Sequence, residues 1–402
     1  MNRLRFLTAG ESHGQALLTI LEGMPSGLAL TDSDINKDLA RRQRGYGRGG
    51  RMQIEKDRVR ILSGVRYGQT LGSPIGLVIE NKDWTNWTQK MAVAPVQDPV
   101  AKLHMPRPGH ADFAGMVKYR HDDLRNILER SSARETTMRV AMGAICRTLL
   151  AQFGVHVYGH VLQIGSIAAP TTALTTLCGR QYHDPAVRQN WLTMMDRVET
   201  SPLACADDAA TQQMMTLIDQ AKERGDTAGG VIELVAVNVP VGLGSHVHFD
   251  RKLDAAIAGA IMSINAIKAV SIGAGYENAF GFGSEVHDQI YWDADYGYYR
   301  SSNNAGGIEG GMSNGEAIVV RAAMKPLPTL VSPLHSVNVS SHDEEMAHSE
   351  RSDVCAVPAA VVVAESMLCY VLADALHEKI GGDSLAEMKN NFAGLAHAPL
   401  AW

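Results

Sequence analysis

The stretch RSSARETTMRVAMGAICRTLLAQF, residues 130–153, carries the strongest secondary-structure signal in this chain. Its apolar side chains recur at helical spacing, which predicts a helix over 132–153 with one buried face. Ser132 and Glu135 stand at the spacing of a capping box at the start of this helix. The apolar positions behind the prediction are Met138, Ala141, Met142, Ile145, Leu149 and Phe153.

Arg130 and Arg134 flank the start of the predicted helix. Free backbone N–H groups and the positive pole of the helix dipole favour a phosphate or carboxylate there. Upstream, Arg107-Pro108-Gly109-His110-Ala111-Asp112 places a histidine in a rigid Pro-Gly turn. The two stretches together indicate an anionic ligand held beside an acid or a base. A well-capped, solvated surface helix is the alternative for 132–153.

Periodicity elsewhere predicts a mixed α/β protein. Further helices are expected over 32–44, 207–224, 250–268 and 358–380, and strands near 4–8, 15–22, 58–65, 74–80, 155–168, 230–239 and 316–324.

A weak internal repeat suggests two similar halves. Met24-Pro25-Ser26-Gly27-Leu28 and Val239-Pro240-Val241-Gly242-Leu243 each follow a predicted strand and precede a predicted helix. Downstream, the stretch from Ser73 to Val78 has a loose counterpart from Ser313 to Ile318. We therefore expect one domain over 1–402 whose halves span roughly 1–150 and 225–385, with a ligand cleft between them. A chance match built on Pro-x-Gly-Leu is the alternative.

Composition excludes several classes of protein. A net charge of −6 argues against bulk attraction to nucleic acid. The best candidate for a membrane span, from Val357 to Leu376, is broken by Glu365 and Asp374, so a cytoplasmic protein is expected. The 5 cysteines form no Cys-x-x-Cys pair, which indicates neither a disulfide framework nor a metal site.

A second histidine lies near the N-terminus, in the stretch from Thr8 to Gly14. His13 follows Ser12 and precedes a glycine there, and glycines leave an imidazole uncovered. Such a histidine suits proton transfer near neutral pH. A hydrogen-bonded structural histidine is the alternative.

The basic run Arg41-Arg42-Gln43-Arg44-Gly45-Tyr46-Gly47-Arg48-Gly49-Gly50-Arg51 has no acidic residue near it, from Leu39 to Ile54. Arginines without local counter-ions suit bidentate capture of phosphate and carboxylate groups. Binding of RNA and a solvated loop are the alternatives.

Two stretches near the C-terminus complete the pattern. The glycine-rich stretch 303–315 lacks the spacing of a P-loop or a dinucleotide-binding loop, so a ligand cradle of another kind stays open. Arg351-Ser352-Asp353 precedes the predicted helix at 358 and puts a cation and a carboxylate near its start.

Five of these stretches, in this order, resemble the successive signatures of chorismate synthase. They are Gly10-Glu11-Ser12-His13-Gly14, the Arg107–Asp112 turn, Arg130-Ser131-Ser132-Ala133-Arg134-Glu135-Thr136, Gly306-Gly307-Ile308-Glu309-Gly310-Gly311 and Arg351-Ser352-Asp353. The resemblance covers nearly the whole chain. It implies a β-α-β sandwich with an internal pseudo-duplication.

The resemblance implies a lyase that acts on a small molecule. Chorismate synthases convert 5-enolpyruvylshikimate 3-phosphate to chorismate and phosphate by anti-1,4-elimination, the final common step of the shikimate pathway towards aromatic amino acids. They require reduced FMN without net redox change, and they are usually homotetramers. No extra reducing module is evident, so an external flavin reductase is expected, with NADPH as an indirect reductant; intrinsic reduction by NADPH stays open.

The resemblance also assigns residues. His110 is expected to protonate or hydrogen-bond the reduced flavin, His13 to act near the substrate or leaving phosphate, and Asp353 to work with a flavin nitrogen. The expected substrate-binding residues are Arg42, Arg48, Arg51, Arg107, Arg134 and Arg351. The expected FMN-binding residues are Arg130, Ser131, Ser132, Asn265, Ala266, Gly310, Lys325, Pro326, Leu327, Pro328, Thr329 and Arg351.

The chain departs from many relatives at Ala269 and Ser271, where they have glycine and an acidic residue.

Two other classes of protein remain as alternatives. A basic-loop RNA-binding protein predicts salt-sensitive retention on RNA, and a flavin-dependent oxidoreductase predicts net hydride transfer from a nicotinamide. The order of the five stretches weighs against both.

Overall fold

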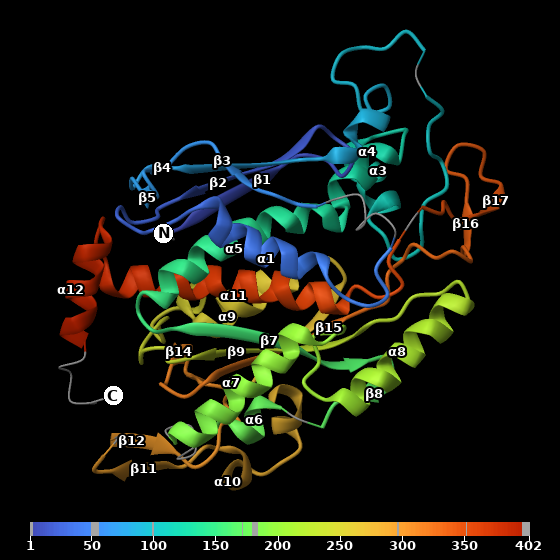
Figure 1. Cartoon of the computed structure of the whole chain (residues 1–402). Helices are drawn as coiled ribbons and strands as arrows, with labels where there is room; N and C mark the ends of the chain where they lie inside the picture. Colours follow the sequence, from blue (N-terminus) through green and yellow to red (C-terminus); the bar gives the residue numbers. More distant parts are fainter. Residues whose placement is uncertain are drawn as a thin grey trace.

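A computed structural model describes residues 3–49, 56–98, 100–170, 172–178, 184–295, 297–350 and 352–395. Two antiparallel sheets enclose a layer of helices (Figure 1). The first sheet has the order β1 (Arg5–Ala9), β2 (Ala16–Glu22), β6 (Ile75–Glu80) and β3 (Arg60–Ile61). The second has the order β10 (Ile267–Ile272), β15 (Ile318–Met324), β9 (Gly230–Val237), β7 (His156–Ile164) and β8 (Ile167–Ala168). The predicted β-α-β sandwich is confirmed.

The layer between the sheets contains α1 (Asp32–Gln43), α5 (Thr136–Ala151), α9 (Leu253–Met262) and α11 (Val357–Ile380). The tightest approach joins α5 to α11, because a Cβ on Gly143 would overlap the Cα and Cβ of Ser366. By length and composition α11 could cross a membrane, but most of it is buried inside the protein. Its uniform apolarity is that of a core helix.

The internal pseudo-duplication is confirmed in the strand register. Leu21 of β2 pairs with Ile75 of β6, and Ala236 of β9 pairs with Ile318 of β15 in the same relation. The outer strands repeat the pattern, since β1 pairs with β2 as β7 pairs with β9. The second sheet thus includes β7, which precedes residue 225. A second half that began at residue 225 would therefore lack one strand of its own sheet.

The Pro-x-Gly-Leu stretches are equivalent down to their hydrogen bonds. Thr70 donates its hydroxyl to the carbonyl of Pro25 at 2.6 Å, and Ser313 donates its hydroxyl to the carbonyl of Pro240 at 2.6 Å. The glycine after each proline has a positive φ, 83° in the first half and 82° in the second. The expected match of Ser73 with Ser313 is therefore corrected, because Ser313 is the counterpart of Thr70.

The halves differ on their outer faces. An insertion between β8 and β9 contains α6 (Ala173–Thr176), α7 (Pro185–Thr200) and α8 (Asp208–Glu223). Trp191, Met195 and Val198 of α7 pack with Val235 and Val319 of the second sheet. The first sheet has no such cover among the described residues: Leu7 is 76% exposed and Ile20 is 54% exposed.

Two local predictions need correction. The helix expected over 250–268 ends at Met262, and β10 begins at Ile267. The capping box at Ser132 is incomplete: Ser132 Oγ accepts from the Arg134 N–H at 3.3 Å, but the Glu135 carboxylate accepts from Arg139 Nε at 2.9 Å. A competing ion pair one turn along the helix explains the difference. The segment is a 3₁₀ turn, η2 (Ala133–Glu135), that leads into α5.

The remaining elements connect these layers or lie at their ends. They are β4 (Val65–Arg66), β5 (Gln69–Thr70), η1 (Lys82–Asn86), α3 (Asp112–Tyr119), α4 (Arg125–Ser131), η4 (Phe249–Arg251), η5 (Gly275–Ala279), α10 (Gly283–Val286), β11 (Ile290–Asp293), β12 (Gly297–Arg300), β13 (Ile308–Glu309), β14 (Met312–Ser313), β16 (His335–Val337), β17 (Glu344–Met346) and α12 (Leu385–Leu395).

Glu316, directly after the glycine-rich stretch, makes stability depend on pH. It is 1% exposed, and its Oε2 has no hydrogen-bond partner among the described residues. Burial raises the pKa of this carboxyl from 4.5 to about 7. Because the folded state holds the proton more tightly, the stabilisation is complete below about pH 4.5 and is lost as pH rises through about 7, amounting to about 3 kcal/mol.

We expect the variant Glu316→Gln to avoid this loss because its amide carries no charge. The melting temperature of the variant relative to that of the unchanged protein should therefore rise between pH 5 and pH 8. A difference in melting temperature that stays constant over this range would contradict the assignment.

Candidate active site

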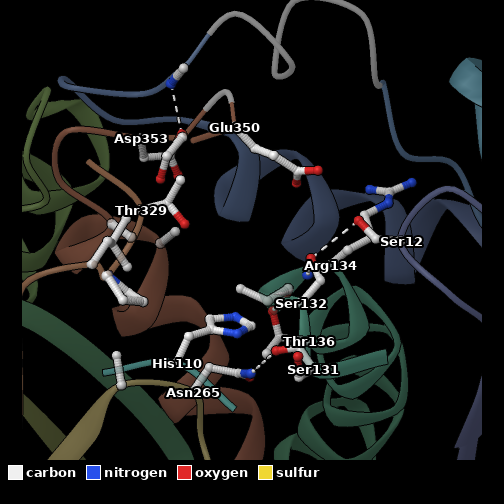
Figure 2. Close-up of a pocket in the computed structure, with 18 of the residues that line it drawn as sticks. Ser12, His110, Ser131, Ser132, Arg134, Thr136, Asn265, Thr329, Glu350 and Asp353 are labelled. Carbon is white, nitrogen blue, oxygen red and sulfur yellow. Dashed lines mark hydrogen bonds between the residues drawn. The ribbon is translucent and has the colours of Figure 1, made fainter. Parts of the chain in front are cut away.

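A cavity of about 640 Å³ lies where α5 and α11 begin, and Figure 2 shows part of its lining. This volume is in the usual range of about 300–1,000 Å³ for small-molecule sites. Polar residues from both halves of the chain line this cavity together with apolar ones. The apolar part comes from Leu128, Ile264, Met324, Leu327, Ala356, Ala359, Ala360 and Val363. The lining therefore combines an apolar area with many polar groups.

His13 reaches the cavity from the loop between β1 and β2. Its Nδ1 lies 3.0 Å from both carboxylate oxygens of Glu129, a buried residue in α4. Its ring stacks on Trp87 with 3.8 Å between centroids and 16° between planes. Two neighbours from distant parts of the chain thus fix both the plane and the rotation of this imidazole.

His110 is held by its own loop and by Arg107. Its Nδ1 lies 2.6 Å from Asp112 Oδ1, and the other oxygen of Asp112 accepts from Arg107 Nε at 2.8 Å. Although burial opposes it, hydrogen bonds from His110 and Arg107 hold the pKa of Asp112 well below its usual range. The carboxylate therefore stays charged and orients His110, which extends into the cavity together with Asn265 (Figure 2).

Arg42, Arg48 and Arg134 bring a cluster of cations to the cavity. Arg134 donates to Asp57 at 2.6 Å, whereas Arg42 Nη1 is 4.0 Å from Asp57 and has no hydrogen-bond partner in the described part of the chain. Burial, aided by Arg48 and Arg134, outweighs Asp57 and lowers the pKa of Arg42 to about 10. An anion in the cavity would relieve this repulsion.

Asp353 lies on the loop before α11. It accepts from Arg48 Nη1 at 2.8 Å and from the Gly49 N–H at 2.6 Å. The contact joins the basic loop that follows α1 to the second half of the chain. Asp353 and Glu350 lie together at one side of the cavity in Figure 2.

Other parts of the lining carry amide, hydroxyl and ammonium groups. Asn265 donates its amide to the Ser131 carbonyl at 2.9 Å, and its Oδ1 is buried without a partner among the residues described. Lys325 donates to the Gly109 carbonyl at 3.0 Å, and Arg107 donates to Thr329 Oγ1 at 2.9 Å. Burial, with the nearby Lys268, lowers the pKa of Lys325.

Most of the predicted site residues meet in this cavity. The residues that line it are His13, Arg42, Arg48, Arg107, His110, Ser131, Ser132, Arg134, Asn265, Ala266, Lys325, Leu327, Pro328, Thr329 and Asp353.

Several predicted site residues do not line the cavity. Arg130 points away and donates to the carbonyls of Thr8 and Gly10. Pro326 is not part of the lining, and Gly310 lies in the turn between β13 and β14. Arg51 and Arg351 lie outside the described residues.

Sequence reasoning missed the groups that orient the predicted residues. Glu129 is 116 positions from His13, and Asp57 is 77 positions from Arg134, so no local pattern could reveal either pairing. Trp87 lies in a polar loop without a recognisable motif. Asp112 is different, because it belongs to the same Arg107–Asp112 turn as His110. It was nevertheless assigned no function from the sequence.

Comparison with known proteins agrees with this geometry. The sequence profile described as chorismate synthase matches residues 4–377. The chorismate synthase of Pelobacter propionicus is 55% identical over 399 residues, covering 97% of this chain and 98% of that protein. The Bacillus subtilis enzyme is 51% identical over 394 residues, with 96% and 97% covered.

A solved structure shares the fold as well. The crystal structure of a chorismate synthase matches with a TM-score of 0.78 and 43% sequence identity, covering 99% of each chain. The extent of these matches and the arrangement of four of the five stretches around one cavity lead to the same conclusion: the chain belongs to the chorismate synthase family and is a carbon-oxygen lyase.

Proposed function

We propose that this protein converts 5-enolpyruvylshikimate 3-phosphate to chorismate and phosphate with the help of reduced FMN, as the final common step of the shikimate pathway. One observation carries the proposal. Buried arginines surround a cavity that also holds two histidines, each paired with a buried carboxylate. That combination suits an anionic substrate whose reaction moves a proton and releases phosphate.

The residues present fit a flavin. The unpartnered Oδ1 of Asn265 can accept from a ring N–H, and the apolar area by α11 suits a flat ring. Ser131, Ser132, Lys325 and Thr329 would hold the polar end. When bound, reduced FMN supplies transient electron density to a reaction without net redox change.

The side chains supply positioning and proton transfer. Arg42, Arg48 and Arg134 bind the phosphate and carboxylate groups of the substrate and stabilise the departing phosphate. His13 takes part in proton transfer through its Nε2, beside the leaving group. His110, oriented by Asp112, would hydrogen-bond the flavin, and Asp353 would lie beside the flavin ring and assist proton transfer there.

An anaerobic assay with 5-enolpyruvylshikimate 3-phosphate and chemically reduced FMN tests the proposal, with chorismate and phosphate followed together. Equal release of both products supports it. A parallel reaction with oxidised FMN and NADPH tests for intrinsic flavin reduction; we expect no product there, because we propose an external reductase. Folded, FMN-binding protein without product would favour a flavin-dependent oxidoreductase.

We further propose a cytoplasmic homotetramer. All 5 cysteines are free thiols, as expected in a reducing compartment. The outer face of the first sheet, with exposed Leu7, Leu18 and Ile20, is the counterpart of the face that α7 covers in the second half. A second copy of this chain is the expected cover.

Placing a charge on that face should weaken the assembly. We expect Ile20→Lys to lower the molar mass measured by light scattering, because burying an unpaired ammonium opposes association. Val93→Lys is the control, since Val93 is equally apolar and lies fully exposed on a separate loop. An unchanged molar mass for Ile20→Lys would exclude this face as the interface.

A further inference from the structure

Glu129 holds His13 by three contacts. One carboxylate oxygen accepts from the His13 backbone N–H at 2.8 Å, and both oxygens lie 3.0 Å from His13 Nδ1. The carboxylate is 1% exposed. The buried carboxylate of Glu129 in α4 therefore contacts both the backbone and the side chain of His13.

This geometry selects one form of the imidazole. An ionised carboxylate can only accept, so the hydrogen must be on Nδ1. The neutral ring then has its lone pair on Nε2, at the opposite side of the ring from Glu129. Trp87 stacks on the ring and prevents rotation out of this orientation. Within the described ranges, no residue forms a hydrogen bond with Nε2, and His13 lines the cavity.

Arg125 provides the counter-charge for Glu129. Its Nη1 donates to Glu129 Oε1 at 3.0 Å, and its guanidinium lies 5.1 Å from the centroid of the Trp87 ring. The arginine thus contacts both groups that hold His13. The cavity is lined by His13, Trp87 and Glu350, and Glu350 lies 3.7 Å from Arg125.

We propose that Glu129 is a positioning residue for the lyase reaction: it fixes His13 with hydrogen on Nδ1 and presents Nε2 to the substrate for proton transfer. The inference rests on the proposed function, because it gives His13 a role in that reaction. Glu129 is not among the residues that line the cavity, so it acts through His13.

The substitution Glu129→Gln changes which tautomer of His13 is favoured, while the side chain at position 129 keeps its shape. The amide can donate to Nδ1, and the stable neutral ring then carries its hydrogen on Nε2, where it can no longer accept a proton. We expect kcat to fall about 10²-fold, with KM and FMN affinity little changed.

A double-mutant cycle separates positioning from structural support. In a His13→Ala background, Glu129→Gln should cause no further loss of kcat, because the group on which Glu129 acts is gone. Nitrogen-15 NMR, with the His13 signals assigned by difference from His13→Ala, should show the hydrogen moving from Nδ1 to Nε2 in Glu129→Gln.

The chain provides a matched control outside the cavity. Glu233 is also buried, lies 3.1 Å from His160 Nε2 and accepts from Arg321 Nε at 3.0 Å. We expect both Glu233→Gln and Glu129→Gln to lower the melting temperature. Only Glu233→Gln should leave kcat near that of the unchanged protein.

Three results would overturn the proposal while the unchanged protein is active: an unchanged kcat in Glu129→Gln, an additive loss in the His13→Ala background, or the same ring tautomer in both proteins. Absence of product from the unchanged protein would instead overturn the proposed function, and the NMR comparison would still test the positioning of His13.

Discussion

Replacing His110 with alanine should leave a folded protein that loses most of its turnover, by about 10²- to 10⁴-fold in kcat. The imidazole extends into the cavity and is oriented by Asp112 at 2.6 Å. In the proposed reaction, its removal takes away a group that would contact the reacting ligands. The free energy of unfolding should change little, because the loop is anchored independently by the pair between Arg107 and Asp112.

The measurements are kcat with reduced FMN and the melting temperature of the same sample. His248 is a matched control, since its Nδ1 lies 2.8 Å from Asp250, two residues along, but both are exposed. His248→Ala should retain normal turnover. A His110→Ala variant that merely unfolds, or that turns over at the normal rate, would contradict the role given to His110.

Replacing Glu365 with glutamine should cost about 3–5 kcal/mol of stability, the usual result of removing one partner from a buried ion pair. Glu365 in α11 accepts from Arg41 at 2.7 Å and from Arg147 at 2.6 Å, and so joins α1 and α5 to α11. Although burial alone would lower it, the pairing with Glu365 holds the pKa of Arg41 above its usual value. Without the carboxylate charge of Glu365, Arg41 and Arg147 stay packed between the helices with less negative charge beside them.

Thermal unfolding measures this effect, and Glu22→Gln is the control. Glu22 also pairs with an arginine, Arg5, but both side chains are at least half exposed, so its loss should change stability little. Similar melting temperatures for Glu365→Gln and the unchanged protein would show that the pair adds no net stability.

The sequence predicted elements where one periodicity dominated. Helix 132–153 and the long C-terminal helix have apolar faces that local spacing reveals. The end of the helix predicted over 250–268 was wrong because Asn265-Ala266 starts a turn into β10 despite apolar neighbours, and Ala266 adopts a positive φ of 67°. Helix α7 was missed, since its buried side is mainly Trp191, Met195 and Val198 among polar residues.

Prediction of the candidate site was limited by distance along the chain. Residues within motifs, such as His13 and Arg134, could be found because their neighbours formed recognisable patterns. The groups that hold them could not, because pairings such as His13 with Glu129 depend on which loops the fold brings together. The assigned roles of the site residues remain predictions.

The close packing of Gly143 in α5 against Ser366 in α11 joins two parts of the chain that are synthesised far apart in time. The first sheet is built from residues 5–80 and can form early during synthesis, since all its strands belong to the first 80 residues. The face of α5 that packs against α11 lacks its partner until α11, near the end of the chain, has been made. Until then an apolar surface is exposed to other chains, so slow synthesis of the second half prolongs the period in which aggregation competes with folding.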